Sequence, residues 1–197
     1  FLLVLLCHYM SFGQQYLVTT LAGSGEPGST DGIGQAATFQ YLSDVAIGSD
    51  GTIYVADTSN NKIRKVYPTG VVTTFAGSSI ISSVDGPAAT ASFSRPNSLA
   101  LDASGNIYFT ESDSNRIRKI TPDGYVSTLA GSDIQGNADG AGALASFKDP
   151  ENIEVDASGN IFVVDTGNYT IRKITAEGYV TTFAGNGVSA IVDGTGT

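Results

Sequence analysis

Short runs rich in β-branched and aromatic residues, separated by polar turns, recur along the chain at a constant spacing. The run GTIYVADTSNNKIRKV at 51–66 returns as GNIYFTESDSNRIRKI at 105–120 and as GNIFVVDTGNYTIRKI at 159–174. Each copy follows the previous one after 54 residues, without insertion or deletion. A fixed period of this length indicates a repeat architecture.

Each repeat contains four stretches that predict β-strands. The first is a short apolar run, DVAI at 44–47, SLAL at 98–101 and NIEV at 152–155. The second and third belong to the motif above, and the fourth is VVTTFAG, YVSTLAG or YVTTFAG. Turns with Asp, Ser and Gly join them, because Asp and Ser bond their own backbone and Gly accepts a positive φ. Short turns between successive strands predict an antiparallel meander.

A longer connector leads from each meander to the next, from Gly77 to Pro96 and from Gly131 to Pro150. It is too long for a simple hairpin, and we expect one helical turn in its Ala-rich centre. The recurring Asp-Gly pair, as at 85–86, is interpreted as turn chemistry. Phe39, Phe93 and Phe147 end the connectors, and we expect them in the core where one unit meets the next.

A single four-stranded unit cannot bury both of its faces. Radial stacking of such units solves this problem and forms a β-propeller. We therefore expect an all-β protein, a β-propeller of four-stranded antiparallel blades with a 54-residue repeat, present as a partial ring of about half. The expected propeller segment is 14–197, with an orphan fourth strand at 16–23, repeats at 24–77, 78–131 and 132–185, and a partial repeat at 186–197. We also expect the native protein to continue beyond residue 197, with the orphan strand completing another blade.

Residues 1–13, FLLVLLCHYMSFG, are typical of the end of a secretory signal peptide. Their apolar run is too short to span a bilayer, and small residues precede a cut before Gln14. A buried N-terminal strand is the alternative. Cleavage predicts a secreted, extracellular or periplasmic protein without membrane insertion. It would also remove Cys7 and His8, the one cysteine and the one histidine of the sequence.

The composition and the net charge limit which kinds of binding partner are expected. The 197 residues are 41% hydrophobic and 15% charged with 24 glycines, which is typical of a globular β protein. The net charge of −9 repels phosphate backbones, so nucleic acid is not an expected partner.

The motif resembles NHL repeats, most fully in the third copy, DASGNIFVVDTGNYTIRKITAEGYVTTFAG at 156–185. The resemblance covers essentially all of 16–197 and is closest to secreted bacterial NHL proteins. It implies a β-propeller, six-bladed in many members, in which the first strand of each blade lines a central channel. The first copy departs from the pattern at Leu42, where the others have proline, and the third departs at Ala176.

The same resemblance raises an enzymatic alternative. NHL-like lyases and the related lactonase propellers hold metal in the channel with histidines and carboxylates. After cleavage this part of the chain has neither imidazole nor thiol, which excludes a His–Cys zinc site and a Ser-His or Cys-His nucleophile pair within it. No catalytic residue or metal ligand is therefore assigned.

Carboxylate and hydroxyl oxygens remain as candidate ligands. Asp44, Ser98 and Asn152 occupy the same place at the start of each first strand, beside a second row of Ser43, Asn97 and Glu151. Such a ring of oxygens could hold Ca²⁺, although strand starts commonly carry polar caps. Glu154 replaces Ala46 and Ala100, so it is either a channel ligand with a partner or a charge open to water. We take Asp44, Ser98, Asn152 and Glu154 as channel candidates for ligand binding, with Ca²⁺ as the one cofactor considered.

Basic residues concentrate in the third strands, which hold eight of the ten: Lys62, Arg64, Lys65, Arg116, Arg118, Lys119, Arg172 and Lys173. An acid precedes each hairpin turn, at Asp57, Glu111 and Asp165, with a spacing that suits cross-strand pairing. We favour a ladder of ion pairs and solvated side chains over an RNA-binding stripe, given the acidic net charge.

These features predict an exported, non-catalytic propeller that binds or scaffolds a protein or glycan on its loop faces. The alternative is a calcium-dependent lyase or lactonase-type propeller with catalytic residues mostly outside this part. We also expect the open half-ring to self-associate, because exposed apolar blade faces and unpaired strand edges favour association.

Overall fold

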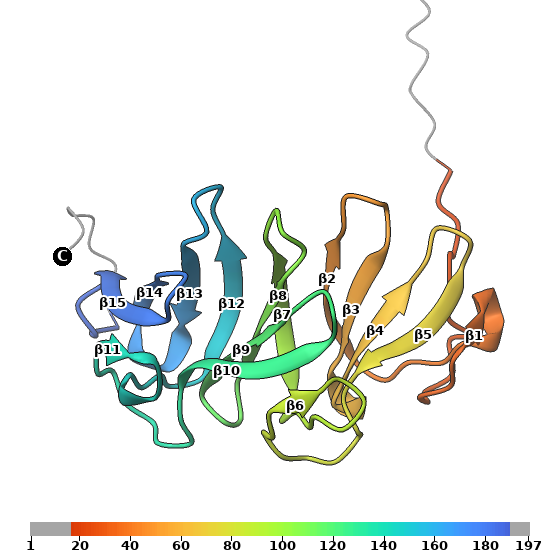
Figure 1. Ribbon diagram of the computed structural model, residues 1–197. Coiled ribbons are helices and arrows are strands. Elements are labelled where there is room, and N and C mark those ends of the chain that lie inside the picture. Colours follow the sequence, from red (N-terminus) through yellow and green to blue (C-terminus); the bar gives the residue numbers. More distant parts are fainter. Residues whose placement is uncertain (1–16, 190–197) are drawn as a thin grey trace, which may run out of the picture.

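The computed structural model describes residues 17–189, which form three antiparallel sheets in chain order (Figure 1). The first sheet consists of β1 (Gly32–Ile33), β2 (Leu42–Ile47), β3 (Ile53–Asp57), β4 (Lys62–Val66) and β5 (Val71–Ala76). The second consists of β6 (Gly86–Pro87), β7 (Pro96–Leu101), β8 (Ile107–Glu111), β9 (Arg116–Ile120) and β10 (Tyr125–Gly131). The third consists of β11 (Gly140–Ala141), β12 (Pro150–Val155), β13 (Ile161–Asp165), β14 (Thr170–Ile174) and β15 (Tyr179–Ala184). The all-β propeller architecture and the four meander strands of each unit are confirmed.

Helix is confined to short 3-10 turns within the described residues, at η1 (Gly34–Ala36), η2 (Thr58–Asn60), η3 (Gly142–Leu144) and η4 (Thr166–Asn168). Of these, η3 is the helical turn expected in the connector 131–150, and η1 lies at the equivalent place of the first unit, whereas the connector 77–96 has a turn without a helix at residues 88–90. None of the helices in residues 17–189 is long and apolar enough to cross a membrane.

The core lies between neighbouring sheets, because side chains alternate between the two faces of a strand. The side chains of Ala56, Ile63 and Ala76 project from the first sheet. They form one buried cluster with Phe93 and Phe109 of the second unit. The equivalent cluster between the second and third sheets holds Phe147. Phe93 and Phe147 are completely buried, which confirms the expected core role for these two, whereas Phe39 is half-buried at the edge of the cluster in the first unit.

Each sheet has a fifth strand that the sequence analysis did not predict. Two residues of the connector, in β1, β6 or β11, pair antiparallel with the last strand of the same unit. In the second sheet, for example, Gly86 pairs with Val126. The prediction of four-stranded blades is therefore corrected to five, because the connector edge satisfies backbone groups that the outer strand would leave open.

A buried arginine ties each connector to its own blade. Arg118 is fully buried; its Nη1 donates to Glu111 Oε1 at 2.6 Å and its Nη2 to Asp85 Oδ1 at 2.8 Å. Its guanidinium also lies 5.8 Å from the centre of the Phe93 ring. The same cluster forms around Arg64, with Asp57, Asp31 and Phe39, and around Arg172, with Asp165, Asp139 and Phe147.

These clusters correct two expectations. The hairpin acids do pair across the strands, as predicted, but with arginines that are buried rather than solvated. The Asp of each connector Asp-Gly pair, at Asp31, Asp85 and Asp139, is more than a turn residue, because it supplies the second carboxylate of the cluster. Both follow from the fifth strand, which carries that aspartate over the arginine.

The expected orphan strand at 16–23 is wrong over its described part. Residues 17–23 form no strand, and Leu17 and Val18 are about 90% exposed, at 89% and 90%. A strand needs a paired neighbour, and no described strand takes that place. The expected signal peptide at 1–13, with Cys7 and His8, and most of the partial repeat lie outside the described residues.

Replacing Arg118 by methionine should destabilise the protein by about 3–5 kcal/mol, because Glu111 would remain buried without its partner. The free energy of unfolding in urea measures this loss. The matched control is Arg95→Met, which breaks an exposed 3.4 Å pair with Asp113 and should cost less than about 1 kcal/mol. Equal losses in the two variants would contradict the structural role of the buried cluster.

Candidate functional site

A row of hydrogen bonds connects the first strands of neighbouring units, which are β2, β7 and β12. Ser98 Oγ donates to Asp44 Oδ2 at 2.7 Å, and the Leu99 N–H donates to the same oxygen at 2.9 Å. One unit further on, the Ile153 N–H donates to Ser98 Oγ at 3.4 Å. The structure thus brings Asp44 and Ser98 into direct contact, across 54 residues of sequence.

The neighbouring row does the same. Ser43 Oγ donates to the Asn97 carbonyl, and Asn97 Nδ2 donates to the Glu151 carbonyl at 3.4 Å. Asn152 is exposed, and its side chain makes no hydrogen bond to Asp44 or Ser98 within the described residues. The other oxygen of Asp44 accepts the N–H of Val45 at 2.8 Å. Both carboxylate oxygens therefore hold protein groups, and the Ca²⁺ ring stays a prediction.

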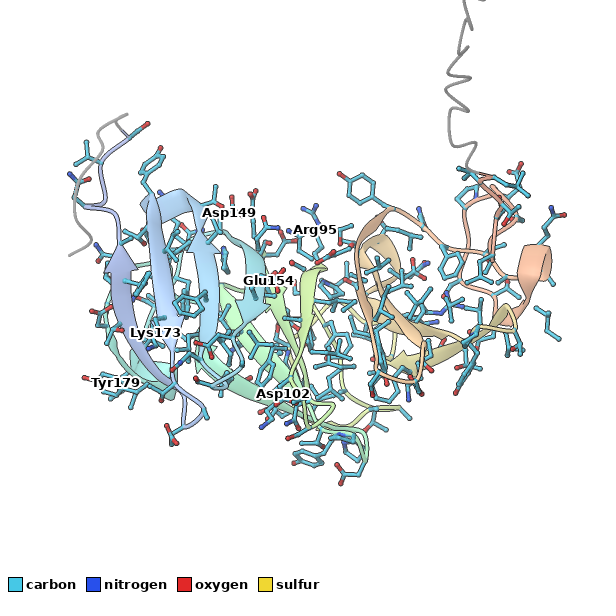
Figure 2. All side chains as sticks on the ribbon, turned by 90° about the horizontal axis from the view of Figure 1, so that it is seen from above. Arg95, Asp102, Asp149, Glu154, Lys173 and Tyr179 are labelled. Carbon is cyan, nitrogen blue, oxygen red and sulfur yellow. The ribbon has the colours of Figure 1, made fainter. Side chains whose placement is uncertain are left out.

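Glu154, labelled in Figure 2, lies in β12, two residues after Asn152. It pairs in register with Phe162, while its neighbour Ile153 points into the core between the second and third sheets. Ala46 and Ala100, at the same position, pack against the cores between sheets. Glu154 is exposed, so it needs no buried partner, and no hydrogen bond joins it to Asp44 or Ser98 within the described residues.

Two polar grooves open where the turns after the first strands meet. The first groove, of about 430 Å³, lies between the turn 47–50 of the first unit and the turn 101–105 of the second. The second groove, of about 350 Å³, lies between that same turn and the turn 155–159 of the third unit. The sequence analysis assigned these segments to turns only. Their shared acids, at Asp102 and Asp156, were the signal that stacked units would gather carboxylates at one end.

Asp102 stands at the junction of the two grooves (labelled in Figure 2). Its Oδ1 accepts the N–H groups of Ser104 and Asn106, both at 2.9 Å. Its Oδ2 accepts Asn106 Nδ2 at 2.7 Å and the Tyr108 hydroxyl at 3.0 Å. Gly105 closes the turn at a φ of 81°, a conformation that suits glycine. The turn is thus held rigidly against the groove walls.

The electrostatics of the grooves are set by these bonds. Partial burial works to raise the pKa of Asp102, but hydrogen bonds from Asn106, Tyr108 and Ser104 outweigh it and hold the pKa below its ordinary value. Burial, with the bond to Asp102, raises the pKa of Tyr108 to about 12. The Asn160 side chain lowers the pKa of Asp156 in the same way. At neutral pH the grooves therefore present carboxylates beside neutral hydroxyl groups.

Metal-binding geometry is a separate question. Within residues 17–189, no group of three or more His, Cys, Asp or Glu side chains is placed to hold one metal ion.

Comparisons with known proteins place the chain among β-propellers. The family model described as "Alkaline phosphatase PhoX" matches residues 30–197. Teneurin-4 of Mus musculus is 29% identical over 192 residues, which cover 82% of this chain and 7% of the relative. The solved structure of an auxiliary nutrient binding protein from Bacteroides ovatus gives a TM-score of 0.62 at 21% identity, over 76% of this chain and 39% of that one. A catalytically inactive virginiamycin B lyase from Staphylococcus aureus, solved with quinupristin, gives 0.53 at 23%, over 72% and 40%.

These likenesses support the fold and leave the finer NHL assignment and secretion as predictions. The chain spans less than a tenth of the curated relatives it matches, at 9% and 7% of their lengths. It spans about 40% of the matched propeller structures, at 39% and 40%, and the described residues form no closed ring.

The depressed pKa of Asp102 predicts a dependence of stability on pH. A carboxyl group with a folded pKa below its unfolded value contributes stability above the unfolded pKa, and loses it as pH falls through the folded pKa. The difference in melting temperature between the wild type and Asp102→Asn should therefore shrink as pH falls from about 6 to about 3.

The control for this titration is Asp133→Asn, since Asp133 is 72% exposed in its pair with Arg116. Its melting temperature should stay close to that of the wild type throughout. A difference in melting temperature between the wild type and Asp102→Asn that stays constant or grows as the pH falls would contradict the lowered pKa of Asp102.

Proposed function

We propose a binding function for this chain, which belongs to the family described as alkaline phosphatase PhoX. It acts as an exported β-propeller module that holds a protein or a glycan at the turn end of its blades. The observation that carries this proposal is the pair of grooves that share Asp102.

The groove walls suit a hydroxyl-rich ligand. The Asp102 and Asp156 carboxylates hold their own turns, and the exposed side chains of Ser49, Ser104 and Ser158 offer hydroxyl groups to a ligand. Leu101 and Val155 supply apolar wall between them. A few convergent polar groups over an apolar wall are typical of small-ligand sites. The acidic charge also disfavours anionic ligands, in keeping with the expectation that nucleic acid is not a partner.

Rigidity favours binding at this place. The turn 101–105 is fixed by four bonds to Asp102, and the strands below it are stitched by the Asp44–Ser98 contact. A surface that is already ordered loses little conformational entropy when a ligand binds. The nutrient-binding propeller from Bacteroides ovatus is compatible with such a role, as a protein of the same fold.

A second candidate function is enzymatic. The family match favours hydrolysis of phosphate esters over the calcium-dependent lyase or lactonase activity that the NHL resemblance implied. Release of 4-nitrophenol from 4-nitrophenyl phosphate, with and without added Ca²⁺, tests it directly. Hydrolysis of 4-nitrophenyl phosphate that persists in the purified protein, and that decreases in a groove variant, would favour the enzymatic function over the binding function.

The binding proposal is tested by blocking the second groove. Ala157 is an exposed wall residue, and Ala157→Arg should fill the space between the two turns without touching the core. On an array of defined oligosaccharides and extracellular-matrix proteins, we expect wild-type binding to one ligand class and at least about a tenfold loss in the variant.

The matched control is Ala36→Arg, an equally exposed change in η1, remote from both grooves. Binding by this control should equal that of the wild type. Retained binding by Ala157→Arg would show that the ligand binds outside the second groove. If no ligand on the array binds, the phosphatase assay decides between the two candidate functions.

A further inference from the structure

The two grooves at the turn end of the blades are built from equivalent segments of successive units. The turn 101–105 is a wall of both grooves, and the outer walls come from the first and the third unit. Ser49 and Ala157, one in each outer wall, occupy the same place in their turns, two 54-residue repeats apart. Figure 1 shows the three turns, between β2 and β3, β7 and β8, and β12 and β13, along one edge of the molecule. The grooves are therefore neighbouring copies of one site with a common wall.

The aspartates of the three turns differ in how much hydrogen-bonding capacity they keep for a ligand. An ionised carboxylate accepts about four hydrogen bonds. Asp102 accepts four from its own unit and is therefore saturated. Asp156 accepts three, all from the turn 156–160, and Asp50 accepts two, both from Thr52. The acceptor positions that remain open thus lie in the outer walls, one wall for each groove, on either side of Asp102.

The first groove also contains a hydrogen-bond donor that the protein does not use. The Tyr54 hydroxyl lines this groove, and it makes no hydrogen bond within residues 17–189. Its counterpart Tyr108 is almost completely buried and donates to Asp102. The difference arises because Asp50 stands two residues further along its turn than Asp102 does. Burial and the charge of Asp50 raise the pKa of Tyr54, so the hydroxyl keeps its proton at neutral pH and can donate it to a ligand oxygen.

Apolar side chains form the remainder of the groove walls. Ile47, which is 66% exposed, lies in the first groove with Leu101 and Pro122, and the second groove has Leu101 and Val155. Apolar surface beside donors and acceptors matches a sugar ring, which carries C–H groups on its faces and hydroxyls that both donate and accept. The carboxylates repel acidic sugars, and among the described residues that line the grooves no basic side chain offsets them. A neutral sugar fits this lining.

The backbone of the groove walls offers little to a peptide. An extended peptide gains affinity by pairing its main chain with an open strand edge. The turns that form the walls bond to themselves instead. The Gly48 N–H donates to the Thr52 carbonyl at 2.8 Å, and the Asp102 N–H donates to the Asn106 carbonyl at 3.0 Å. The free groups in the grooves are therefore side-chain hydroxyls and carboxylate oxygens, which favours a glycan over a protein segment.

We propose that a neutral linear glycan binds across both grooves, with a sugar ring in each groove and the linkage between them over the turn 101–105. This inference rests on the proposed binding function and narrows its ligand to one class. Equivalent sites in series, as repeat proteins present them, suit a ligand whose own units repeat. One chain that occupies both grooves binds more tightly than a single sugar, because the second contact forms at a high effective concentration.

Calorimetric titration of the whole chain with oligosaccharides of increasing length tests this arrangement. The probes are three neutral linear series, the cello-, malto- and manno-oligosaccharides, each from the disaccharide to the longest soluble member. In at least one series we expect the longer chains to bind at least about tenfold more tightly than the disaccharide, because only they reach both grooves. The gain should appear at one chain length and then level off.

Two matched substitutions block one groove at a time. Ser49→Arg fills the first groove and Ala157→Arg fills the second, at equivalent exposed positions. Each variant should still bind the disaccharide in the groove that stays open, which shows that it is folded. Each should lose the gain of at least about tenfold with chain length. Ala36→Arg, remote from both grooves, should keep that gain.

Tyr54→Phe separates ligand contact from stability. The substitution removes a hydroxyl that has no hydrogen-bond partner among the described residues, so the midpoint of unfolding in urea should equal that of the wild type. The affinity for the longer chains should fall by about threefold to tenfold, the loss expected for one hydrogen bond. Unchanged affinity in this variant would overturn the placement of a sugar in the first groove.

Other outcomes separate this inference from the proposed function. Equal affinity of the wild type for every chain length would mean that one groove acts alone. Binding of a matrix protein from the array, with no oligosaccharide bound, would assign the site to the other ligand class. Either result overturns the two-groove glycan site and leaves the binding function in place. If neither the oligosaccharides nor any member of the array binds, both are overturned.

Discussion

The fold depends on a buried guanidinium that is held between two carboxylates and an aromatic ring. A charge placed in a core is costly unless its partners surround it, and these three partners come from two segments, a hairpin strand and the connector. For Arg118 they are the hairpin acid Glu111, the connector acid Asp85 and the connector ring of Phe93. A blade therefore cannot bury its arginine until its own connector has closed over it. The second carboxylate remains about half exposed, with Asp85 at 46%, so the excess negative charge of the cluster stays hydrated.

The stacking of the blades follows from this closure. Because the connector is fixed over the arginine, its phenylalanine projects toward the preceding sheet. For Phe93, the side chain packs there against Ala56, Ile63 and Ala76. The first strands are then brought close enough for the Asp44–Ser98 contact, and the turns above them meet to form the two grooves. The grooves, the interfaces between units and the core are consequences of one repeated arrangement.

The spacing of landmarks was enough to predict the strands and the turns, because these depend on neighbours within one unit. The buried Phe93 and Phe147 were predicted from their recurrence at the ends of the connectors, where one unit meets the next. Contacts between distant segments were harder. Arg118 and Asp85 are 33 residues apart, and only the fifth strand brings them together, so the sequence analysis took the aspartate for a turn residue. Glu154 stays a channel candidate, and alternation with the apolar Ile153 could have predicted that the two side chains lie on opposite faces of the strand. The grooves arise between units, and no pattern within one unit reveals them.

Hydrogen–deuterium exchange of the Arg118→Met variant is the most direct test of the claim that the buried arginine fastens connector to blade. We predict that amide protection falls together in the connector, at Ala88 and Ser92, and in β8 and β9, while β3 and β4 of the first sheet keep theirs, because Arg64 still holds its own cluster. Loss of protection confined to the β8–β9 hairpin, with Ala88 and Ser92 unchanged, would contradict it. The connector would then be held by its backbone pairing to β10 alone.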